Sequence, residues 1–263
     1  MGSFVKTTQQ LQKTAGGKTI FYDAGMLSLY WETKPELIEK VLPKELKPGK
    51  KPVVKAFIAD YPRTSFCPPY KEAGLFVPAI KDGQEGDYCL SMPITDGQAM
   101  AMGREIMGLP KKMADIRISI NGGRFTSSIE RNGIVFFKVD AEIGAGTNEP
   151  TREAELLKAT ADGMNIFHVK YTKAPDGSGF DLPPTLYANK LDCQCRVVKP
   201  AKVEMELTDS PHDPWAELEP VKLLGGVYSQ GDNTLQKGTK LGPLSPMEFL
   251  PYTFTRWDWW LGE

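Results

Sequence analysis

Short, β-prone segments separated by turn signals restrict the fold of this chain more than any other feature. Its 25 glycines and 21 prolines are spread along the whole length, so the segments between them are short. The segments with β-branched or aromatic residues in partial alternation, as in strands, are 18–31, 53–61, 86–92, 113–120, 125–130, 134–143, 167–172 and 191–207. Turn sequences such as Asn121-Gly122-Gly123, Asn132-Gly133 and Asp176-Gly177 separate some of them. We therefore expect antiparallel hairpins, because parallel strands need longer crossovers than these gaps allow.

Helices are predicted to be few and short. Residues 33–36, Thr-Lys-Pro-Glu, form a capping-box pattern with an early proline, which predicts a helix to about residue 42. A second helix is expected over 150–160, with acidic residues at its N-terminus. A third is expected from Asp96, a suitable N-cap, to Met107, where a glycine and a proline follow. The sequence thus predicts one α+β domain over residues 1–263, mostly antiparallel β.

Composition excludes several classes of function. Lysine and arginine number 32 against 33 aspartates and glutamates, a balance that argues against a nucleic-acid partner. With only His168 and His212, a histidine-rich metal site is not expected, and neither metal nor cofactor is predicted. The apolar runs are shorter than the roughly 20 residues of a membrane helix, so no membrane partner is expected. Four cysteines and no apparent leader predict a cytoplasmic protein with reduced thiols, and Cys193-Gln194-Cys195 is interpreted as strand packing.

Two adjacent lysines are the main candidates for chemistry. Gly103-Arg104-Glu105 is followed by Pro110-Lys111-Lys112, where a predicted helix meets a predicted strand. Most such pairs are solvated, but a lysine that attacks a carbonyl must be neutral, and its ordinary pKa is about 10.4. Burial or a neighbouring cation lowers that pKa. Strand alternation alone would bury Lys112 and not Lys111, whereas a bulge after Pro110 would reverse this, so the pattern leaves the assignment open.

These motifs resemble the signature of the acetoacetate decarboxylase family. Tyr70-x-Glu72-x-Gly74 followed by Gly86-Asp87-Tyr88 matches in order and spacing, residues 21–46 resemble an early family segment, and residues 220–222 a late one. The resemblance covers about residues 18–230 and is most specific over 70–112. It implies an acetoacetate decarboxylase-like β-cone or barrel with a few short helices, assembled as a homo-oligomer.

The resemblance also assigns roles to individual residues. Lys111 becomes the nucleophile that forms a Schiff base with the substrate ketone, and Lys112 the neighbour that lowers its pKa; this family is itself the established example of a lysine so activated. Glu72 becomes a pocket carboxylate. Arg104 and Glu105 lie beside the lysines, where the Arg104 guanidinium is expected to hold a substrate carboxylate; a structural ion pair is the alternative for these two.

Two positions depart from the family pattern. Decarboxylating members have an arginine where this chain has Ala24 and a second pocket glutamate where it has Phe57, so the substrate-binding surface is expected to become apolar. Met107 is a further expected pocket residue that desolvates the lysine. Tyr252, in the C-terminal segment, is a candidate acid–base group, with a packed aromatic as the alternative. The tryptophan-rich segment 256–260 is expected to cover the core or a subunit interface.

The predicted function is a lyase that acts on a small-molecule keto acid through a lysine Schiff base. Decarboxylation of a β-keto acid such as acetoacetate is the family default. The alternative is an aldolase-dehydratase, or a cyclase, acting on a 2-keto acid such as pyruvate plus an aldehyde. A non-catalytic small-molecule-binding β-barrel, with the lysines on its surface, is a third reading.

Overall fold

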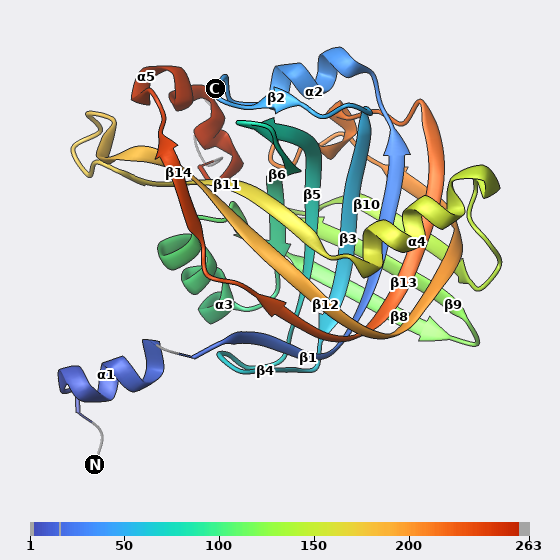
Figure 1. Cartoon of the computed structure of the whole chain (residues 1–263), viewed down its shortest axis with the longest axis horizontal. Helices are drawn as coiled ribbons and strands as arrows, with labels where there is room; N and C mark the ends of the chain where they lie inside the picture. Colours follow the sequence, from blue (N-terminus) through green and yellow to red (C-terminus); the bar gives the residue numbers. More distant parts are fainter. Residues whose placement is uncertain (1–2, 16, 258–263) are drawn as a thin grey trace.

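A single large sheet organises the molecule, which we describe from a computed structural model over residues 3–15 and 17–257 (Figure 1). Its main path runs β11-β6-β5-β3-β1-β13-β12-β10-β9-β8. The first seven of these strands are β11 (Met164–Lys173), β6 (Gln84–Ile94), β5 (Tyr70–Lys81), β3 (Val53–Tyr61), β1 (Thr19–Glu32), β13 (Lys222–Leu235) and β12 (Phe180–Leu207). Because β11 also pairs with β12, these seven close into a barrel.

Three more strands extend the sheet from the barrel wall. They are β10 (Ile134–Ile143), β9 (Arg124–Arg131) and β8 (Asp115–Asn121), joined by the hairpins expected from the sequence. Strand β12 is 28 residues long and belongs to both parts, since it pairs with β11 and β13 in the barrel and with β10 beyond it. The short strands are β2 (Lys47–Pro48), β4 (Arg63–Thr64), β7 (Lys111–Met113) and β14 (Thr239–Pro243). Pairing is antiparallel except for β11–β6 and β6–β7, which confirms the predicted fold class.

Helices are short and lie around the sheet (Figure 1). The α-helices are α1 (Thr8–Ala15), α2 (Pro35–Val41), α3 (Gly97–Ala101), α4 (Glu153–Ala161) and α5 (Pro246–Phe249). The π-helix η1 (Met102–Met107) continues α3, and the 3-10 helices are η2 (Pro150–Arg152), η3 (Trp215–Glu217) and η4 (Leu250–Thr255). None of the helices in the described ranges has the length and apolar character needed to cross a bilayer.

One helix start agrees with the sequence prediction and another does not. Asp96 caps α3 as expected, because its carboxylate accepts the Ala99 N–H at 2.7 Å. The capping box predicted at residues 33–36 is wrong. Lys34 is the N-cap of α2 and makes no side-chain cap, while the Thr33 hydroxyl donates instead to the Glu219 carbonyl at 2.8 Å. A distant backbone acceptor thus competes successfully for the capping hydroxyl.

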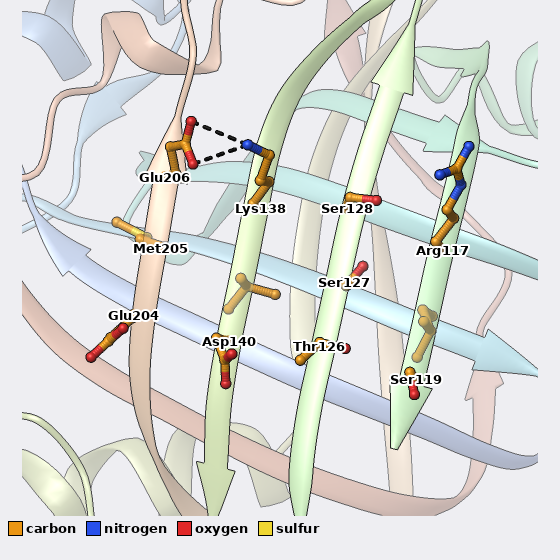
Figure 2. Close-up of a pocket in the computed structure, with 12 residues that line it drawn as sticks. Arg117, Ser119, Thr126, Ser127, Ser128, Lys138, Asp140, Glu204, Met205 and Glu206 are labelled. Atoms are coloured by element: carbon orange, nitrogen blue, oxygen red, sulfur yellow. Dashed lines mark hydrogen bonds and ion pairs between the residues drawn. The ribbon is translucent and has the colours of Figure 1, made fainter. Parts of the chain in front are cut away.

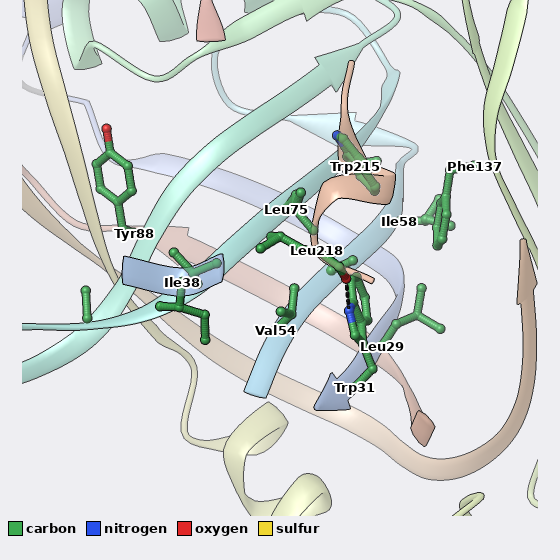
Figure 3. Packing of buried hydrophobic residues seen from close by; sticks show 14 of the residues in the cluster. Leu29, Trp31, Ile38, Val54, Ile58, Leu75, Tyr88, Phe137, Trp215 and Leu218 are labelled. Atoms are coloured by element: carbon green, nitrogen blue, oxygen red, sulfur yellow. Dashed lines mark hydrogen bonds between the residues drawn. The ribbon is translucent and has the colours of Figure 1, made fainter. Parts of the chain in front are cut away.

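The buried apolar residues fall into two main clusters. The larger packs α2 and η3 against the sheet, and Figure 3 shows Trp31 and Trp215 within it. There the indole N–H of Trp31 donates to the Leu218 carbonyl at 2.8 Å, so this fully buried tryptophan keeps a hydrogen bond. Trp257 packs against the same cluster. Asp258, Trp259 and Trp260, the rest of the predicted tryptophan-rich cover, lie outside the described residues.

Candidate functional site

The π-helix η1 and strand β7 place the two lysines. The N–H groups of Gly108 and Leu109 both donate to the Gly103 carbonyl, at 2.9 and 3.0 Å, and close the helix. Gly108 has φ +88°, and a Cβ there would lie 2.5 Å from the Cβ of Lys170, so glycine is needed at this reversal. The chain then enters β7, which runs parallel to β6 with Lys111 beside Met92.

Lys111 and Glu72 meet inside the protein. The Lys111 ammonium donates to Oε2 of Glu72, and each residue is only 5% exposed. The lysine stem passes directly over Gly103, because a Cβ at that glycine would lie 2.2 Å from Cε and 2.3 Å from Cδ of Lys111. Gly103 is therefore the residue that makes room for the extended lysine. The structure thus brings together the first lysine of the pair and the carboxylate of the Tyr70-x-Glu72 motif.

Lys111 pairs in the sheet with Met92, and Glu72 pairs with Ile94 and Ala59, which all belong to one apolar cluster that we call the Lys111 chamber. Its buried members are Phe21, Ala24, Met26, Phe57, Ala59, Tyr61, Tyr70, Phe76, Cys89, Met92, Ile94, Ala99, Leu109, Met164, Ile166 and Leu191. Ala24 and Phe57, the two departures from the family pattern, are both among them. The Phe57 ring stacks on Phe76 with centroids 5.8 Å apart, and it occupies the space above Gly74. The two residues expected to make the pocket apolar thus belong to the chamber.

Two tyrosines share the environment of Glu72. Tyr70 precedes Glu72 by two residues on β5, so both side chains lie on the same face of the strand. Burial raises the pKa of Tyr70, as do the charge of Glu72 and a hydrogen bond to its carboxylate. Burial likewise raises the pKa of Tyr61, whose ring centroid is 5.0 Å from that of Tyr70. Tyr70 was part of the predicted motif but was given no role, although its spacing of two residues from Glu72 was a usable signal.

Lys112 occupies the other face of β7. Its ammonium lies 2.9 Å from Oδ1 of Asp213 and donates to the His212 carbonyl at 2.6 Å, and Arg131 contacts the second oxygen of Asp213 at 3.1 Å. Both lysines are buried, so strand alternation through residues 111–120 does not decide between them. The reason is that this segment is two strands, because β7 ends at Met113 and β8 begins at Asp115. The Lys112 ammonium is paired with Asp213 and directed away from the chamber. This placement does not support the predicted role of Lys112 as the cation that activates Lys111.

Of the remaining predicted site residues, one lies at the chamber and three make other contacts or are exposed. Met107 packs half-buried against the chamber. Tyr252 lies with Lys112 along a hollow of about 550 Å³ outside the chamber, and its hydroxyl donates to the Leu42 carbonyl at 2.9 Å. The Arg104 guanidinium lies 5.1 Å from the Trp257 ring centroid, and Glu105 is exposed. The structure therefore does not bring Tyr252 to Lys111, and it shows Arg104 against an aromatic ring.

A second hollow, of about 540 Å³, lies on the extended part of the sheet, on strands β8, β9, β10 and β12 (Figure 2). Its charged side chains are exposed or half-buried. Lys138 contacts Glu206 at 3.1 Å, and Asp140 pairs with Arg124 beside the hollow. Within the described residues this hollow has no buried lysine or carboxylate, whereas Lys111 and Glu72 form a buried pair from the predicted motif, so we take the Lys111 chamber as the candidate active site.

Comparison with known proteins shows the family to which this chain belongs. The sequence profile of the acetoacetate decarboxylase (ADC) family matches residues 6–242, and this chain belongs to that family. An acetoacetate decarboxylase from Chromobacterium violaceum is 30% identical, over 83% of this chain and 86% of that protein. The CLA biosynthesis isomerase of Lactiplantibacillus plantarum is 27% identical, over 98% of this chain and 95% of that protein. The relatives are enzymes, but they are named for different reactions.

Solved structures agree on the fold. Acetoacetate decarboxylase from Legionella pneumophila has a TM-score of 0.78 at 20% identity, covering 92% of this chain and 98% of that one. The enduracididine biosynthesis enzyme MppR, solved with pyruvate, has a TM-score of 0.69 at 16% identity, covering 86% and 91%. At these identities the likeness concerns the fold. It confirms the acetoacetate decarboxylase-like architecture expected from the sequence.

Proposed function

We propose that this protein is an imine-forming enzyme in which Lys111 attacks the ketone of a keto acid. The observation that carries the proposal is the buried contact between the Lys111 ammonium and the Glu72 carboxylate inside an otherwise apolar chamber. A carboxylate in direct contact with the ammonium can act as the general base that accepts its proton before the amine attacks. Glu72 is therefore the group that frees the amine.

The same pair can complete imine formation. The neutral amine of Lys111 attacks the carbonyl carbon, a carbon–nitrogen bond forms, and a proton moves from the attacking nitrogen to the oxygen to give a hydroxyl. Protonated Glu72 then gives its proton to the resulting hydroxyl, and water leaves. The overall step converts ketone and ammonium into a protonated imine and water, and it returns Glu72 to its ionised form. The imine cation accepts electrons from a neighbouring bond and so acts as the electrophile.

Decarboxylation of a β-keto acid is the reaction that we propose first. The carbon–carbon bond to the substrate carboxylate breaks, carbon dioxide leaves, and the electron pair enters the imine to give an enamine. A proton added to the enamine carbon restores the imine, and water then releases the ketone product. The family membership and the names of several relatives support this choice, since they are acetoacetate decarboxylases.

Isomerisation is the second candidate. The relative from Lactiplantibacillus plantarum, which is named as an isomerase, matches almost the full length of both chains. Glu72 lies against the nitrogen that becomes the imine, so it can remove a proton from a carbon next to the imine carbon and return it to another carbon. Aldol addition with dehydration, on pyruvate plus an aldehyde, uses the same imine and is the remaining alternative. It needs an acid–base group at the developing hydroxyl, for which Glu72 and Tyr70 are the described candidates.

Reductive trapping tests the imine directly. The protein is incubated with acetoacetate, and separately with pyruvate, in the presence of sodium borohydride, and the modified peptide is identified by mass spectrometry. We expect an adduct on Lys111 that is lost in Lys111→Ala and kept in Lys112→Ala. An adduct on Lys112 would reverse the assignment within the pair, and no adduct with any keto acid would exclude the proposal. Carbon dioxide release from acetoacetate then separates decarboxylation from the condensation of pyruvate with an aldehyde.

A further inference from the structure

The lining of the Lys111 chamber is unusually rich in methionine. Five of the ten methionines of the chain belong to it: Met26, Met92 and Met164 are fully buried, and Met100 and Met107 pack at its edge. The larger core cluster, in contrast, includes only Met205 among its described members. Methionine is unbranched and adapts its shape, so it is common where a surface must accommodate flexible apolar groups.

Charge inside the chamber is limited to the reacting pair. The buried charged side chains among the described residues are Glu72, Lys111, Lys112, Asp213 and Arg256. Lys112 and Asp213 pair with each other on the other face of β7, and the Arg256 guanidinium lies over the Tyr171 ring, 4.2 Å from its centroid. Small polar substituents beside the ketone would therefore meet apolar side chains and the Glu72 carboxylate.

The two partly buried methionines lie on the helical segment beside Lys111. Met100 is on α3 and Met107 at the end of η1, so both belong to the helical segment that covers Lys111 through Gly103. This segment is tied to the loop before β5 by a hydrogen bond from the Gln98 amide to the Phe66 carbonyl, at 3.2 Å. Phe66 itself packs partly buried against the chamber. The cover over Lys111 is thus apolar on its inner side.

From these observations we propose that the chamber selects ketones, or keto acids, that carry an unbranched alkyl chain of about four or more carbons. The inference rests on the proposed function of Lys111 and specifies its substrate class. The ketone carbon lies at the Lys111 nitrogen, and the alkyl chain lies among the methionine side chains toward Met107. Whatever bond then breaks at the imine, apolar contact with the chain supplies most of the binding.

A series of methyl ketones tests the substrate class separately from the reaction. Acetone, 2-butanone, 2-pentanone, 2-heptanone and 2-nonanone are trapped on the whole protein with sodium cyanoborohydride, and the adduct on Lys111 is measured against ketone concentration. We expect the half-saturating concentration to fall about four-fold for each methylene added, until the chamber is full. A half-saturating concentration that stays constant or rises beyond acetone would overturn the inference while leaving the imine intact. No Lys111 adduct with any ketone would instead overturn the proposed function.

Two matched variants locate the chain. Met107→Gln places a side chain of similar length but higher polarity at the edge of the chamber. We expect it to raise the half-saturating concentration of 2-heptanone by at least five-fold (on the order of one buried methylene or more) and that of acetone by a smaller factor. Met113→Gln is the control, since Met113 is 43% exposed and outside the cluster, and neither ketone should respond to it. An unchanged 2-heptanone value in Met107→Gln, with the circular dichroism spectrum retained, would refute this placement of the chain.

Discussion

Replacing Gly103 with alanine tests the geometry of the site more sharply than removing a charged group. The added Cβ would lie 2.2 Å from Cε and 2.3 Å from Cδ of Lys111, whereas carbon atoms in contact prefer about 3.5–4.0 Å. Either the lysine stem or the π-helix backbone must therefore move by more than about 1 Å. A misplacement of this size at a reacting group costs on the order of 100-fold in rate. We expect Gly103→Ala to lower kcat by about that factor.

The matched control is Gly97→Ala. Gly97 lies at the start of α3 in the same helical segment, and a Cβ there would meet no atom within 4 Å. Alanine is favoured over glycine within a helix, so this variant should be as stable as the wild-type protein or slightly more stable. Both variants are assayed for carbon dioxide release from acetoacetate, for the rate of borohydride trapping at Lys111, and for the midpoint of thermal unfolding.

The outcome separates displacement of the lysine from general damage. If the reasoning is right, Gly103→Ala loses turnover and trapping rate together, retains most of its thermal stability, and Gly97→Ala retains all three properties. A Gly103→Ala protein with wild-type turnover would show that Lys111 does not need its observed path over the glycine. Equal loss of activity in Gly97→Ala would show that the helical segment is sensitive to any added methyl group.

Four further substitutions address the electrostatics. Glu72→Gln should lower turnover by about 10²- to 10⁴-fold, measured at saturating substrate, because the acid–base group is lost. Tyr70→Phe, which removes a hydrogen bond to Glu72, should alter the pH dependence of kcat with little change in KM, and an unchanged profile would deny Tyr70 this role. Lys112→Met should leave the alkaline limb of the activity profile in place but destabilise the protein in urea by about 3–5 kcal/mol, the cost of breaking a buried pair. Burial lowers the pKa of His168 from 6.5 to about 4. The unfolded chain therefore binds this proton at a higher pH than the folded protein, and the free energy of unfolding should drop by about 3 kcal/mol as pH falls from 6.5 to 4. His168→Gln should reduce this dependence of stability on pH.

Several strands and helix ends could be predicted because the residues that determine them lie close together in the sequence. Strands β3 and β10 have the predicted bounds, and the Asp96 cap follows from side-chain chemistry within four residues. Strand β5 was missed as a strand, since Gly74 and Pro78 interrupt its alternation, and only the barrel pairing on both sides stabilises it. The bend from α3 into a π-helix was also missed. Its closing hydrogen bonds, from the N–H groups of Gly108 and Leu109 to the Gly103 carbonyl, accompany the passage of Lys111 over Gly103, and residue type does not specify this packing.

The site shows the same division. The motif resemblance indicated Lys111 as the nucleophile and Glu72 as a carboxylate of the same pocket, and the structure places these two residues, 39 positions apart, in contact. It could not indicate the partner of Lys112, because Asp213 lies 101 positions further along, after strands β8, β9, β10, β11 and β12. Tyr252 was assigned from residue type and Arg104 from its place in the motif. Their observed contacts, with the Leu42 carbonyl and the Trp257 ring, come from the packing of the C-terminal segment on the barrel.

Because they lie on opposite faces of one short strand, the two adjacent lysines contact different carboxylates. Strand β7 has only three residues and is held parallel to β6 by pairing with Met92, Pro93 and Ile94, so its side chains must alternate between the chamber and the opposite face. On the opposite face, Lys112 meets the carboxylate of Asp213 beside η3, and the pair joins that loop to the barrel. On the chamber side, Lys111 meets Glu72 among apolar groups that solvate neither charge. In the proposed mechanism Glu72 accepts the proton of Lys111, and the apolar residues beside the pair are also the surface that would select an alkyl ketone.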